Sequence, residues 1–223
     1  MTRIGLIHAT PLAVEPIASS FARHWPQAQL QNILDDSLSL DRAREGQLSP
    51  AMRQRFAELS RYALSCGCEA LLFTCSAFGP AIEAVAERSD VPTFKPNEAM
   101  FDQALAHPPR GAVLRLGLLA TFEPSIASMV QELQACADAR GLALQIKTAH
   151  VPGAMGDLQG GQADLHHRKI AAAMADLQDC DAVMLAQFSM AAAQALAQQH
   201  SAVPVLSSPD CAVLTLRRKM MHD

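Results

Sequence analysis

The chain has 223 residues, of which half are apolar and 18% are charged, a composition that excludes an intrinsically disordered protein. Its 18 Lys and Arg residues and 22 Asp and Glu residues give a formal charge of -4, so neither nucleic acid nor a membrane surface is an expected partner. The length allows one large core or two small ones.

The first predicted strand, "RIGLIHA" (3–9), is too short for a signal-peptide core or a membrane span, and we expect a cytoplasmic protein. In that compartment most of the six cysteines should be free thiols. "CGC" (66–68) is a C-x-C pair and not the C-x-x-C of redox or zinc sites. Because no cysteine or histidine spacing indicates a metal, we predict none.

Short apolar runs alternate with longer helix-like stretches along the whole chain. The predicted strands are 3–9, 28–34, 69–74, 91–94, 114–121, 142–151, 181–186 and 203–207. The predicted helices are 49–67, 76–89, 97–106, 123–141, 162–179, 189–200 and 208–220. Since parallel strands need helical crossovers, this alternation predicts an α/β protein of parallel sheets with helices on both faces.

The two halves of the chain repeat each other. Three pairs of segments match with a common shift of 112 residues: "RIGLIHA" with "RLGLLAT" (115–121), "CEALLFTCSAF" (68–78) with "CDAVMLAQFSM" (180–190), and "DVPTF" (90–94) with "AVPVL" (202–206). We predict an N-terminal α/β half over 1–108, with its core in 3–95 and its C-terminal helix exchanged or packed across. The C-terminal α/β half is predicted over 109–223.

Residues that follow the strands are the candidates for a site, because ligands of parallel sheets bind beyond the carboxyl ends of the strands. They are 8–10, 74–76, 96–98, 121–125, 187–189 and 207–208. Cys75 precedes a predicted helix, whose N-terminus is expected to lower the pKa of the thiol. The hydroxyls of Thr74 and Ser76 suit a substrate carboxylate. The alternative is a cysteine that serves as a small buried hydrophobic residue.

The chain resembles the aspartate/glutamate/hydantoin racemase superfamily through "LLFTCSAFG" (71–79), "GLLATFEPS" (117–125) and "VPVLSSP" (203–209). The resemblance implies two pseudo-symmetric flavodoxin-like halves, with the active site in the cleft between them. It also implies an enzyme without metal or pyridoxal phosphate, which uses one cysteine from each half on opposite faces of an acidic carbon. On the matching motif, Cys75 is the first of these cysteines.

The second motif departs from the family pattern, because the repeat places Gln187 where the second cysteine is expected. Glutamine carries no proton at neutral pH, and a carbon reprotonated from the face that lost its proton keeps its configuration. Cys180 precedes its strand and is expected at the wrong end of the sheet. A non-cysteine acid such as His8 could face Cys75.

Several residues are expected to bind the substrate. The resemblance places Thr121 and Ser125 in the loop that holds a substrate carboxylate, with a helix cap as the alternative role. His8 could orient a carboxylate or move a proton, or be a hydrogen-bonded rim histidine. The predicted set comprises catalytic Cys75 and substrate-binding His8, Thr10, Thr74, Ser76, Thr121, Ser125, Gln187 and Ser189.

Three residues are expected to have other roles. Glu98 should cap a helix, and His166 and His167 should be solvated or interfacial.

These observations predict a cofactor-independent, racemase- or epimerase-like enzyme that acts on a small carboxylate substrate by thiol-mediated proton transfer. One alternative is a single-cysteine decarboxylase or cis-trans isomerase of a dicarboxylic acid. Another is a catalytically lapsed carboxylate-binding protein. A homo-oligomer is compatible with the sequence.

Overall fold

The structure is a computed structural model, and it describes residues 1–221. Contacts between Cα atoms divide the chain into two compact units. The first unit is Met1–Glu98 together with the segment that begins at Ala212, and the second is Ala99–Cys211. The halves 1–108 and 109–223 were predicted from the sequence repeat, and their boundary remains a prediction.

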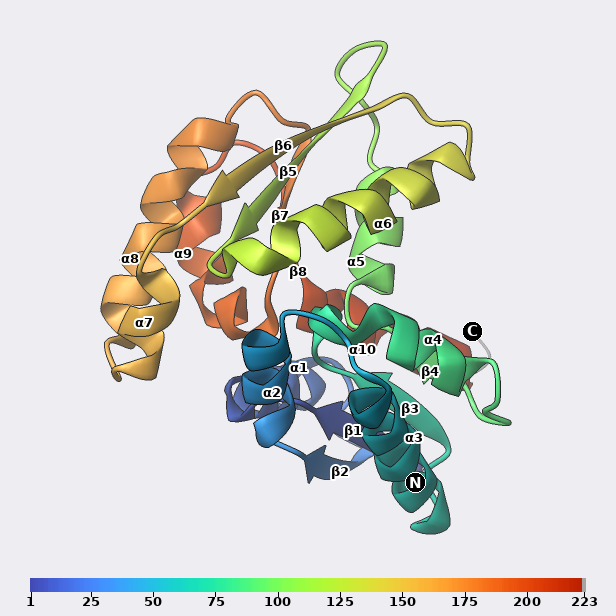
Figure 1. Cartoon of the computed structure of the whole chain (residues 1–223). Coiled ribbons are helices and arrows are strands. Elements are labelled where there is room, and N and C mark those ends of the chain that lie inside the picture. The colour runs from blue at the N-terminus through green and yellow to red at the C-terminus, as the bar shows by residue number, and fades with distance from the viewer. Residues whose placement is uncertain (222–223) are drawn as a thin grey trace. The chain divides into compact units, whose positions relative to one another are not determined.

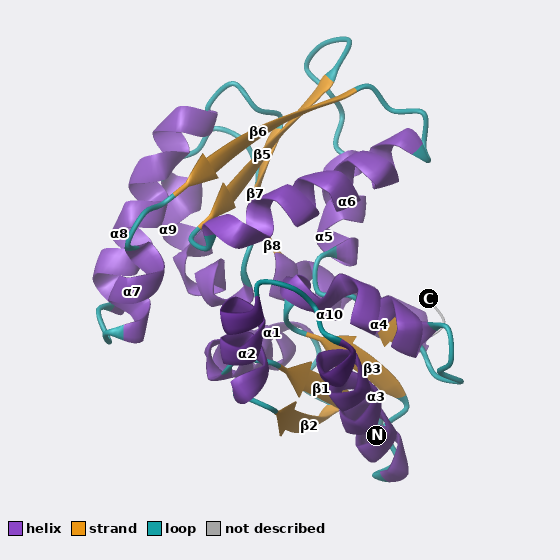
Figure 2. Cartoon of the chain, viewed as in Figure 1, coloured by secondary structure: helices purple, strands orange, loops and turns teal. Residues whose placement is uncertain are grey.

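Four parallel strands form the sheet of the first unit, in the order β2-β1-β3-β4 (Figure 1). They are β1 (Arg3–His8), β2 (Gln29–Leu34), β3 (Ala70–Phe73) and β4 (Thr93–Phe94). One face packs against α2 (Ser37–Glu45), α3 (Pro50–Ser65) and α4 (Gly79–Ala86), which bury Leu38, Phe56 and Ile82. The unit also contains α1 (Val14–His24) and α10 (Ser208–Met221), which are joined where Arg217 Nη1 donates to the His24 carbonyl at 2.9 Å (Figure 2).

The second unit has the same strand order, β6-β5-β7-β8, and is also parallel throughout. Its strands are β5 (Leu114–Ala120), β6 (Leu144–His150), β7 (Ala182–Leu185) and β8 (Val205–Ser207). One face packs against α5 (Glu98–Leu105) and α6 (Ile126–Asp138). The other packs against α8 (Ala163–Ala173), the 3-10 helix η4 (Met174–Leu177) and α9 (Gln194–Gln199). The two parallel sheets with helices on both faces confirm the predicted α/β fold.

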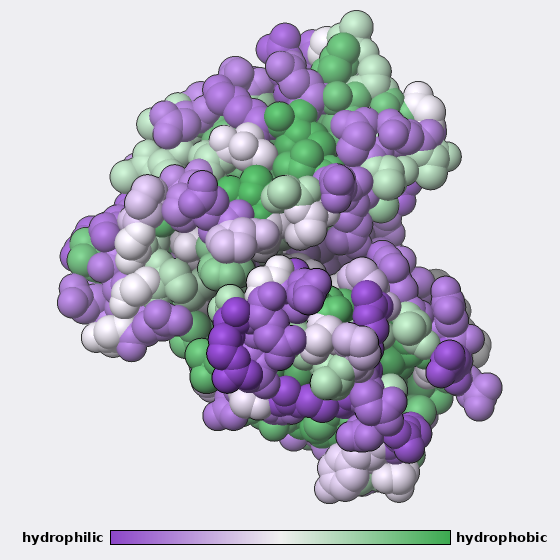
Figure 3. Space-filling model, viewed as in Figure 1, coloured by the Kyte–Doolittle hydropathy of each residue, from purple (hydrophilic) through white to green (hydrophobic). Residues whose placement is uncertain are grey.

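Apolar side chains reach the surface over part of the second unit. Figure 3 shows hydrophobic residues gathered in the region of β5, β6 and α6. Half-buried Val130, Leu144 and Ile146 pack there against the core cluster. The edge strand β6 is therefore covered incompletely on this face.

The repeat seen in the sequence is also a repeat of contacts. The backbone N–H of Arg3 donates to Glu69 Oε1 at 3.0 Å, and that of Arg115 donates to Asp181 Oδ2 at 2.8 Å. Gly5 and Gly117 occupy matching places in the central strands, where a Cβ atom would lie 3.3 Å from the sulfur of Cys68 or of Cys180. Cys68 and Cys180 therefore occupy equivalent positions in the two units, each packed against the glycine of the central strand.

Gly5→Ala is expected to destabilise the protein by about 1–3 kcal/mol, because overpacking a closed core costs that much. The added Cβ would lie 2.9 Å from Leu71 Cδ2 and 3.1 Å from Ala63 Cβ, and both residues are fully buried. Urea unfolding followed by circular dichroism measures the change. Gly156→Ala in α7 (Ala154–Gln159) is the matched control, because no atom lies within 4 Å of the new Cβ. Equal midpoints for Gly5→Ala and the parent would contradict the packing argument.

Three helices, α1, α2 and α7, were not predicted. Each is short or interrupted by polar and helix-breaking residues, such as Pro16 in α1 and Gly156 in α7. Their formation depends on burial against the rest of a unit, as for Leu38 of α2, which is fully buried. Within residues 1–221, no helix is long and apolar enough to cross a membrane.

Candidate functional site

Each sheet has a topological switch point beside its first strand in the chain. β1 lies between β2 and β3, and β5 lies between β6 and β7. Ligands of such sheets bind at the carboxyl ends of the strands at this point. The first unit places His8, Thr74 and Cys75 there, and the second unit places Thr121 and Gln187 there.

His8 ends β1, is fully buried, and is held at both ring nitrogens. Nδ1 lies 2.8 Å from Thr74 Oγ1, and Nε2 lies 3.0 Å from Asn32 Oδ1. Because the amide oxygen of Asn32 only accepts hydrogen bonds, Nε2 carries the proton. The single hydroxyl hydrogen of Thr74 lies within reach of both Nδ1 and the Ile7 carbonyl, which is 3.3 Å from Oγ1. Burial lowers the pKa of His8, and the hydrogen bond to Asn32 offsets part of that effect. His8 is therefore a neutral ring that orients Thr74, and both of its nitrogens are already engaged.

Cys75 is half-buried and directly precedes the 3-10 helix η2 (Ser76–Phe78). Burial raises the pKa of Cys75, although hydrogen bonds from the Ala77 backbone N–H and the Ser39 side chain oppose that effect. The predicted lowering of this pKa is therefore wrong. The reason is that desolvation of the thiolate outweighs the N–H groups of a single short turn. At neutral pH the resting group is a thiol.

Ser39 reaches Cys75 because α2 is anchored at its start. The Ser39 backbone N–H donates to the Ala9 carbonyl at 3.3 Å. Arg55 of α3 holds the same segment, with Nε 2.8 Å from Asp35 Oδ2 and Nη1 2.7 Å from Asp41 Oδ2. Burial alone would raise the pKa of Asp35, but hydrogen bonds from Arg55 and Ser37 outweigh it and lower that pKa.

Asn32, Asp35, Ser39 and Arg55 were missed in the sequence. A usable signal existed for the first two, because the predicted strand 28–34 ends at the same edge of the sheet as strand 3–9. Ser39 and Arg55 lie on helices and gave no comparable signal.

Thr10 and Ser76 are half-buried at the same edge of the first sheet. Thr10 Oγ1 accepts a hydrogen bond from the Leu12 N–H at 3.4 Å and caps the 3-10 helix η1 (Pro11–Ala13). Ser76 is the first residue of η2, next to Cys75. The side chain of Thr10 therefore caps a helix, whereas Ser76 directly follows Cys75.

Gln187 precedes the 3-10 helix η5 (Phe188–Ala193), as Cys75 precedes η2. Its Oε1 accepts from the Thr121 backbone N–H at 2.9 Å and from Thr121 Oγ1 at 3.2 Å. Its Nε2 donates to Ser125 Oγ at 2.9 Å. Ser125 ends the 3-10 helix η3 (Glu123–Ser125) and donates in turn to the Phe122 carbonyl at 2.8 Å. The amide thus joins the loop after β5 to the loop after β7.

The contacts of Gln187 use the groups that were predicted to bind a carboxylate. Thr121 and Ser125 are both buried, with 4% of each residue exposed. The Gln187 amide oxygen takes the two Thr121 donors that would suit a carboxylate oxygen. Gln187 itself offers no proton-carrying atom.

The remaining predicted residues lie in different surroundings. Ser189 is buried within η5, and Glu98 is the acidic residue in the first turn of α5. Of the two predicted alternatives for His166, solvated or interfacial, the first is wrong because the residue is fully buried. Its Nδ1 donates to the Ala154 carbonyl at 2.7 Å. This bond ties α8 to α7. His167 is half-buried, and burial is the main cause that lowers its pKa.

Cys180 and Cys211 are poorer candidates for proton transfer than Cys75. Cys180 is buried ahead of β7, and burial raises its pKa. Cys211 follows β8, but its thiol donates to Gln103 Oε1 at 3.0 Å and burial raises its pKa to about 12. Cys75 is the cysteine that stands at a switch point.

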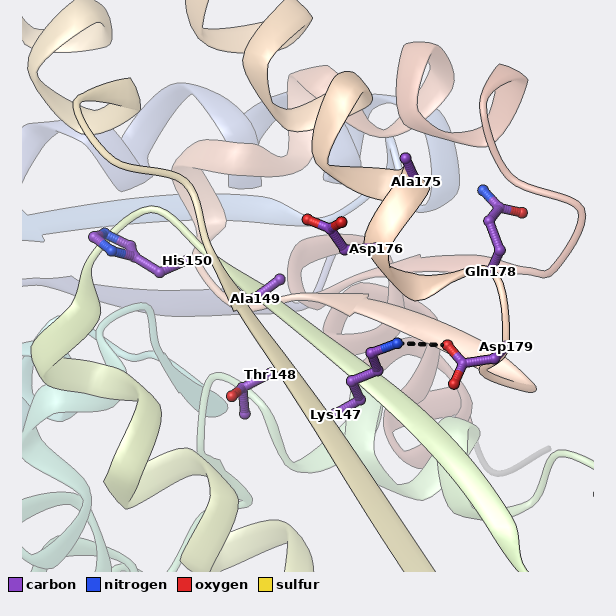
Figure 4. Close-up of a pocket in the computed structure, with 8 residues that line it drawn as sticks. All are labelled: Lys147, Thr148, Ala149, His150, Ala175, Asp176, Gln178 and Asp179. Carbon is purple, nitrogen blue, oxygen red and sulfur yellow. Dashed lines mark hydrogen bonds and ion pairs between the residues drawn. The ribbon is translucent and has the colours of Figure 1, made fainter.

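A surface pocket of about 630 Å³ lies beside the edge strand β6. Figure 4 shows Lys147 of this strand reaching toward Asp179, with Nζ 2.8 Å from Oδ1. None of the residues that line this pocket belongs to the predicted site. Within residues 1–221, the pocket included, no group of three or more His, Cys, Asp or Glu side chains is placed to hold a metal ion.

Comparisons with known proteins bear on the family and the fold. A profile described as Asp/Glu/Hydantoin racemase matches residues 8–219. No curated protein sequence matches the chain.

Solved structures of similar fold include three whose names refer to racemases. Glutamate racemase isoform RacE1 from Bacillus anthracis has 17% identity and a TM-score of 0.76, over 99% of this chain and 82% of that chain. An aspartate racemase homologue from Pyrococcus horikoshii has 15% identity and a TM-score of 0.73, over 100% of both chains. Allantoin racemase from Klebsiella pneumoniae has 18% identity and a TM-score of 0.70, over 100% of this chain and 89% of that chain. At these identities the likeness is one of fold.

Proposed function

Because the chain belongs to the Asp/Glu/Hydantoin racemase family, we propose that it is a racemase-like enzyme in which the Cys75 thiol moves a proton at the carbon next to a carboxylate. The substrate is a small carboxylic acid, and neither metal nor organic cofactor takes part. One observation carries this proposal: a thiol lies at the switch point of the first sheet, with the Ser39 side chain and the Ala77 N–H hydrogen-bonded to it.

The chemistry needs the thiol in both protonation states. The Cys75 thiolate takes the proton from the carbon, and the electron pair left behind spreads into the adjacent carboxylate. The thiol then returns a proton to the same face of the carbon, so exchange of the hydrogen should outpace inversion of the configuration. Hydrogen bonds from Ser39 and the Ala77 N–H favour the thiolate during this step, whereas burial favours the thiol at rest. His8 contributes by fixing Thr74, the residue before Cys75.

A second candidate function is decarboxylation of a dicarboxylic acid, which the environment of Gln187 favours. Loss of carbon dioxide leaves its electron pair on the carbon, so the reaction needs one proton donor and no base. A resting thiol at Cys75 suits that task. The matching residue of the second unit, Gln187, carries no proton at neutral pH.

The pH dependence separates the two candidates. Because burial raises the pKa of Cys75, the thiolate fraction grows as the pH rises from 7 toward that pKa. Proton abstraction should therefore accelerate over this range, with kcat/KM increasing up to about tenfold per pH unit. Protonation after decarboxylation should instead hold constant and then fall once the thiol ionises. Initial rates between pH 6 and 10 give the profile, and a rate of exchange at the reacting carbon that is flat from pH 7 to 9 would contradict Cys75 as the base.

The test of function is a substrate panel in deuterated water. Glutamate, aspartate, allantoin, other hydantoins, malonates and maleate are incubated with the protein, and exchange at the reacting carbon is followed by NMR. Optical rotation and carbon dioxide release are measured on the same samples. Exchange at the reacting carbon supports proton transfer by Cys75, and exchange that outpaces the change of rotation supports a single proton carrier. Gas release supports the decarboxylase. If nothing reacts and a dicarboxylate raises the melting temperature, the protein binds carboxylates without turnover.

A further inference from the structure

A tight turn at the end of α3 brings two cysteines together. Cys66 ends the helix, and Gly67 follows with a φ of +79°, a conformation that favours glycine. The Gly67 N–H donates to the Leu64 carbonyl at 2.9 Å, and the Cys68 N–H donates to the Ala63 carbonyl at 3.3 Å. This pair of bonds is the Schellman pattern, which reverses the chain between the two cysteines. The turn precedes β3, whereas Cys75 follows it.

Both thiols share one polar partner from the neighbouring strand β2. Cys68 Sγ lies 3.4 Å from Gln31 Oε1, and the Cys66 thiol is also hydrogen-bonded to Gln31. Arg3 is the nearest cation, since its Nη1 donates to the Cys66 carbonyl. The two sulfurs therefore lie on the same side of the turn, next to an amide and a guanidinium.

The two thiols differ in exposure and acidity. Cys66 is half-buried, and its pKa is lowered mainly by the hydrogen bond from Gln31, with smaller contributions from Tyr62, Ser65 and Arg3. Cys68 has 5% of its surface exposed, and burial raises its pKa. Cys66 is thus suited to meet an oxidant from solvent, and Cys68 to act from the interior.

We propose that Cys66 and Cys68 form a reversible oxidation site, at which a hydroperoxide converts the two thiols into an intramolecular disulfide. The Cys66 thiolate attacks the outer oxygen of the hydroperoxide, whose O–O bond breaks to release an alcohol or water, and Cys66 becomes a sulfenic acid. The Cys68 sulfur then attacks the Cys66 sulfur and expels water. The hydroperoxide is reduced by two electrons, and the two thiols are oxidised by two electrons. A dithiol restores them by exchange.

The second unit supplies an internal control. Cys180 matches Cys68 in the repeat and packs against Gly117 as Cys68 packs against Gly5. The position that matches Cys66 holds Gln178, whose Nε2 donates to the Met174 and His200 carbonyls. Cys180 therefore lacks a neighbouring thiol two residues before it and should stay reduced.

Oxidation has a structural consequence for the first unit. A disulfide requires a sulfur-to-sulfur distance of about 2.0 Å, so Cys68 must turn toward Cys66. Its sulfur then leaves the contact beneath Gly5, which lies in β1 opposite Leu71 of β3. The oxidised protein is expected to melt at a lower temperature than the reduced protein, and a dithiol should restore the original melting temperature.

The test uses mass spectrometry and is independent of turnover, so it stands whether or not the proposed function holds. Trypsin cleavage after Arg61 and Arg88 leaves Cys66, Cys68 and Cys75 in one peptide. The experiment therefore uses the Cys75→Ser variant, in which a disulfide within this peptide can join only Cys66 and Cys68. It is treated with hydrogen peroxide, alkylated and digested without reduction. Peptide 62–88 should lose two hydrogens and should no longer be alkylated. This disulfide should form about tenfold faster than Cys180 is oxidised.

Two further variants keep the proposal falsifiable. Cys68→Ser in the same background should stop at an oxygenated Cys66, because no second thiol resolves the sulfenic acid. Cys66→Ser should leave Cys68 as slow to react as Cys180. The proposal is overturned if peptide 62–88 gains oxygen while both cysteines are present, if the loss of two hydrogens persists in Cys66→Ser, or if Cys66 reacts no faster than Cys180.

Discussion

Cys75→Ala is expected to reduce turnover of any substrate that the enzyme converts by about 10³-fold or more, because it removes the group that moves the proton. The change deletes one sulfur from a half-buried position at the end of β3. The neighbouring Thr74 keeps its hydrogen bond to His8, so the switch point of the first sheet should stay intact. Steady-state rates of the parent and the variant, at equal substrate concentration, give the ratio.

The matched control for this prediction is Cys66→Ser. Cys66 is also half-buried and belongs to the same unit, but it precedes β3. Its loss should leave turnover within about twofold of the parent, since surface changes away from a site have small effects. The melting temperature of Cys75→Ala, measured beside it, checks the fold. A Cys75→Ala variant that keeps more than a tenth of the parent rate would show that another group carries the proton.

Gln187→Glu is expected to raise KM for a carboxylate substrate by roughly tenfold or more, because it adds a like charge beside the two hydroxyls that are predicted to bind the substrate carboxylate. In the parent, Oε1 of Gln187 accepts from Thr121 and Nε2 donates to Ser125. A carboxylate keeps the first contact but cannot donate to Ser125 Oγ, whose own hydrogen is used on the Phe122 carbonyl. The loop that the family resemblance assigns to the substrate carboxylate would then hold a carboxylate of its own.

Gln145→Glu is the control for net charge. Gln145 lies exposed on the edge strand β6, in the same unit as Gln187, and its replacement adds the same charge away from Thr121. KM should change by less than twofold in that variant, because exposed charges are screened by salt. If Gln187→Glu binds the substrate as tightly as the parent, Thr121 and Ser125 do not hold the carboxylate.

The fold followed from the sequence because its buried strands are continuous apolar runs. Residues 69–74 and 181–186 predicted β3 and β7, and the structure pairs each with the central strand of its sheet, in the same register. The 112-residue shift reflects real contacts, since Gly5 and Gly117 pack against matching cysteines. Helices α1, α2 and α7 escaped prediction because their helical signals are local and weak, and packing within a unit decides their formation.

The chemistry of the site was less accessible to sequence reasoning. The pKa of Cys75 was predicted with the wrong direction, because the sequence shows the neighbouring turn and not the burial of the thiol. The partners of Gln187 are Thr121 and Ser125, which lie 66 and 62 residues away in the chain. Asn32 acts on His8 from a neighbouring strand. A single sequence gives the positions of such residues but not the hydrogen bonds among them.

In the proposed reaction one thiol, that of Cys75, moves the proton. The most direct test compares, on one sample in deuterated water, the rate of exchange at the reacting carbon with the rate of inversion, for each enantiomer of the substrate that the panel identifies. A single carrier returns the deuteron to the face from which the proton left, so exchange should exceed inversion and should vanish in Cys75→Ser. Equal rates of exchange and inversion from both enantiomers would rule out a single carrier, because they require a second group that donates a proton from the opposite face.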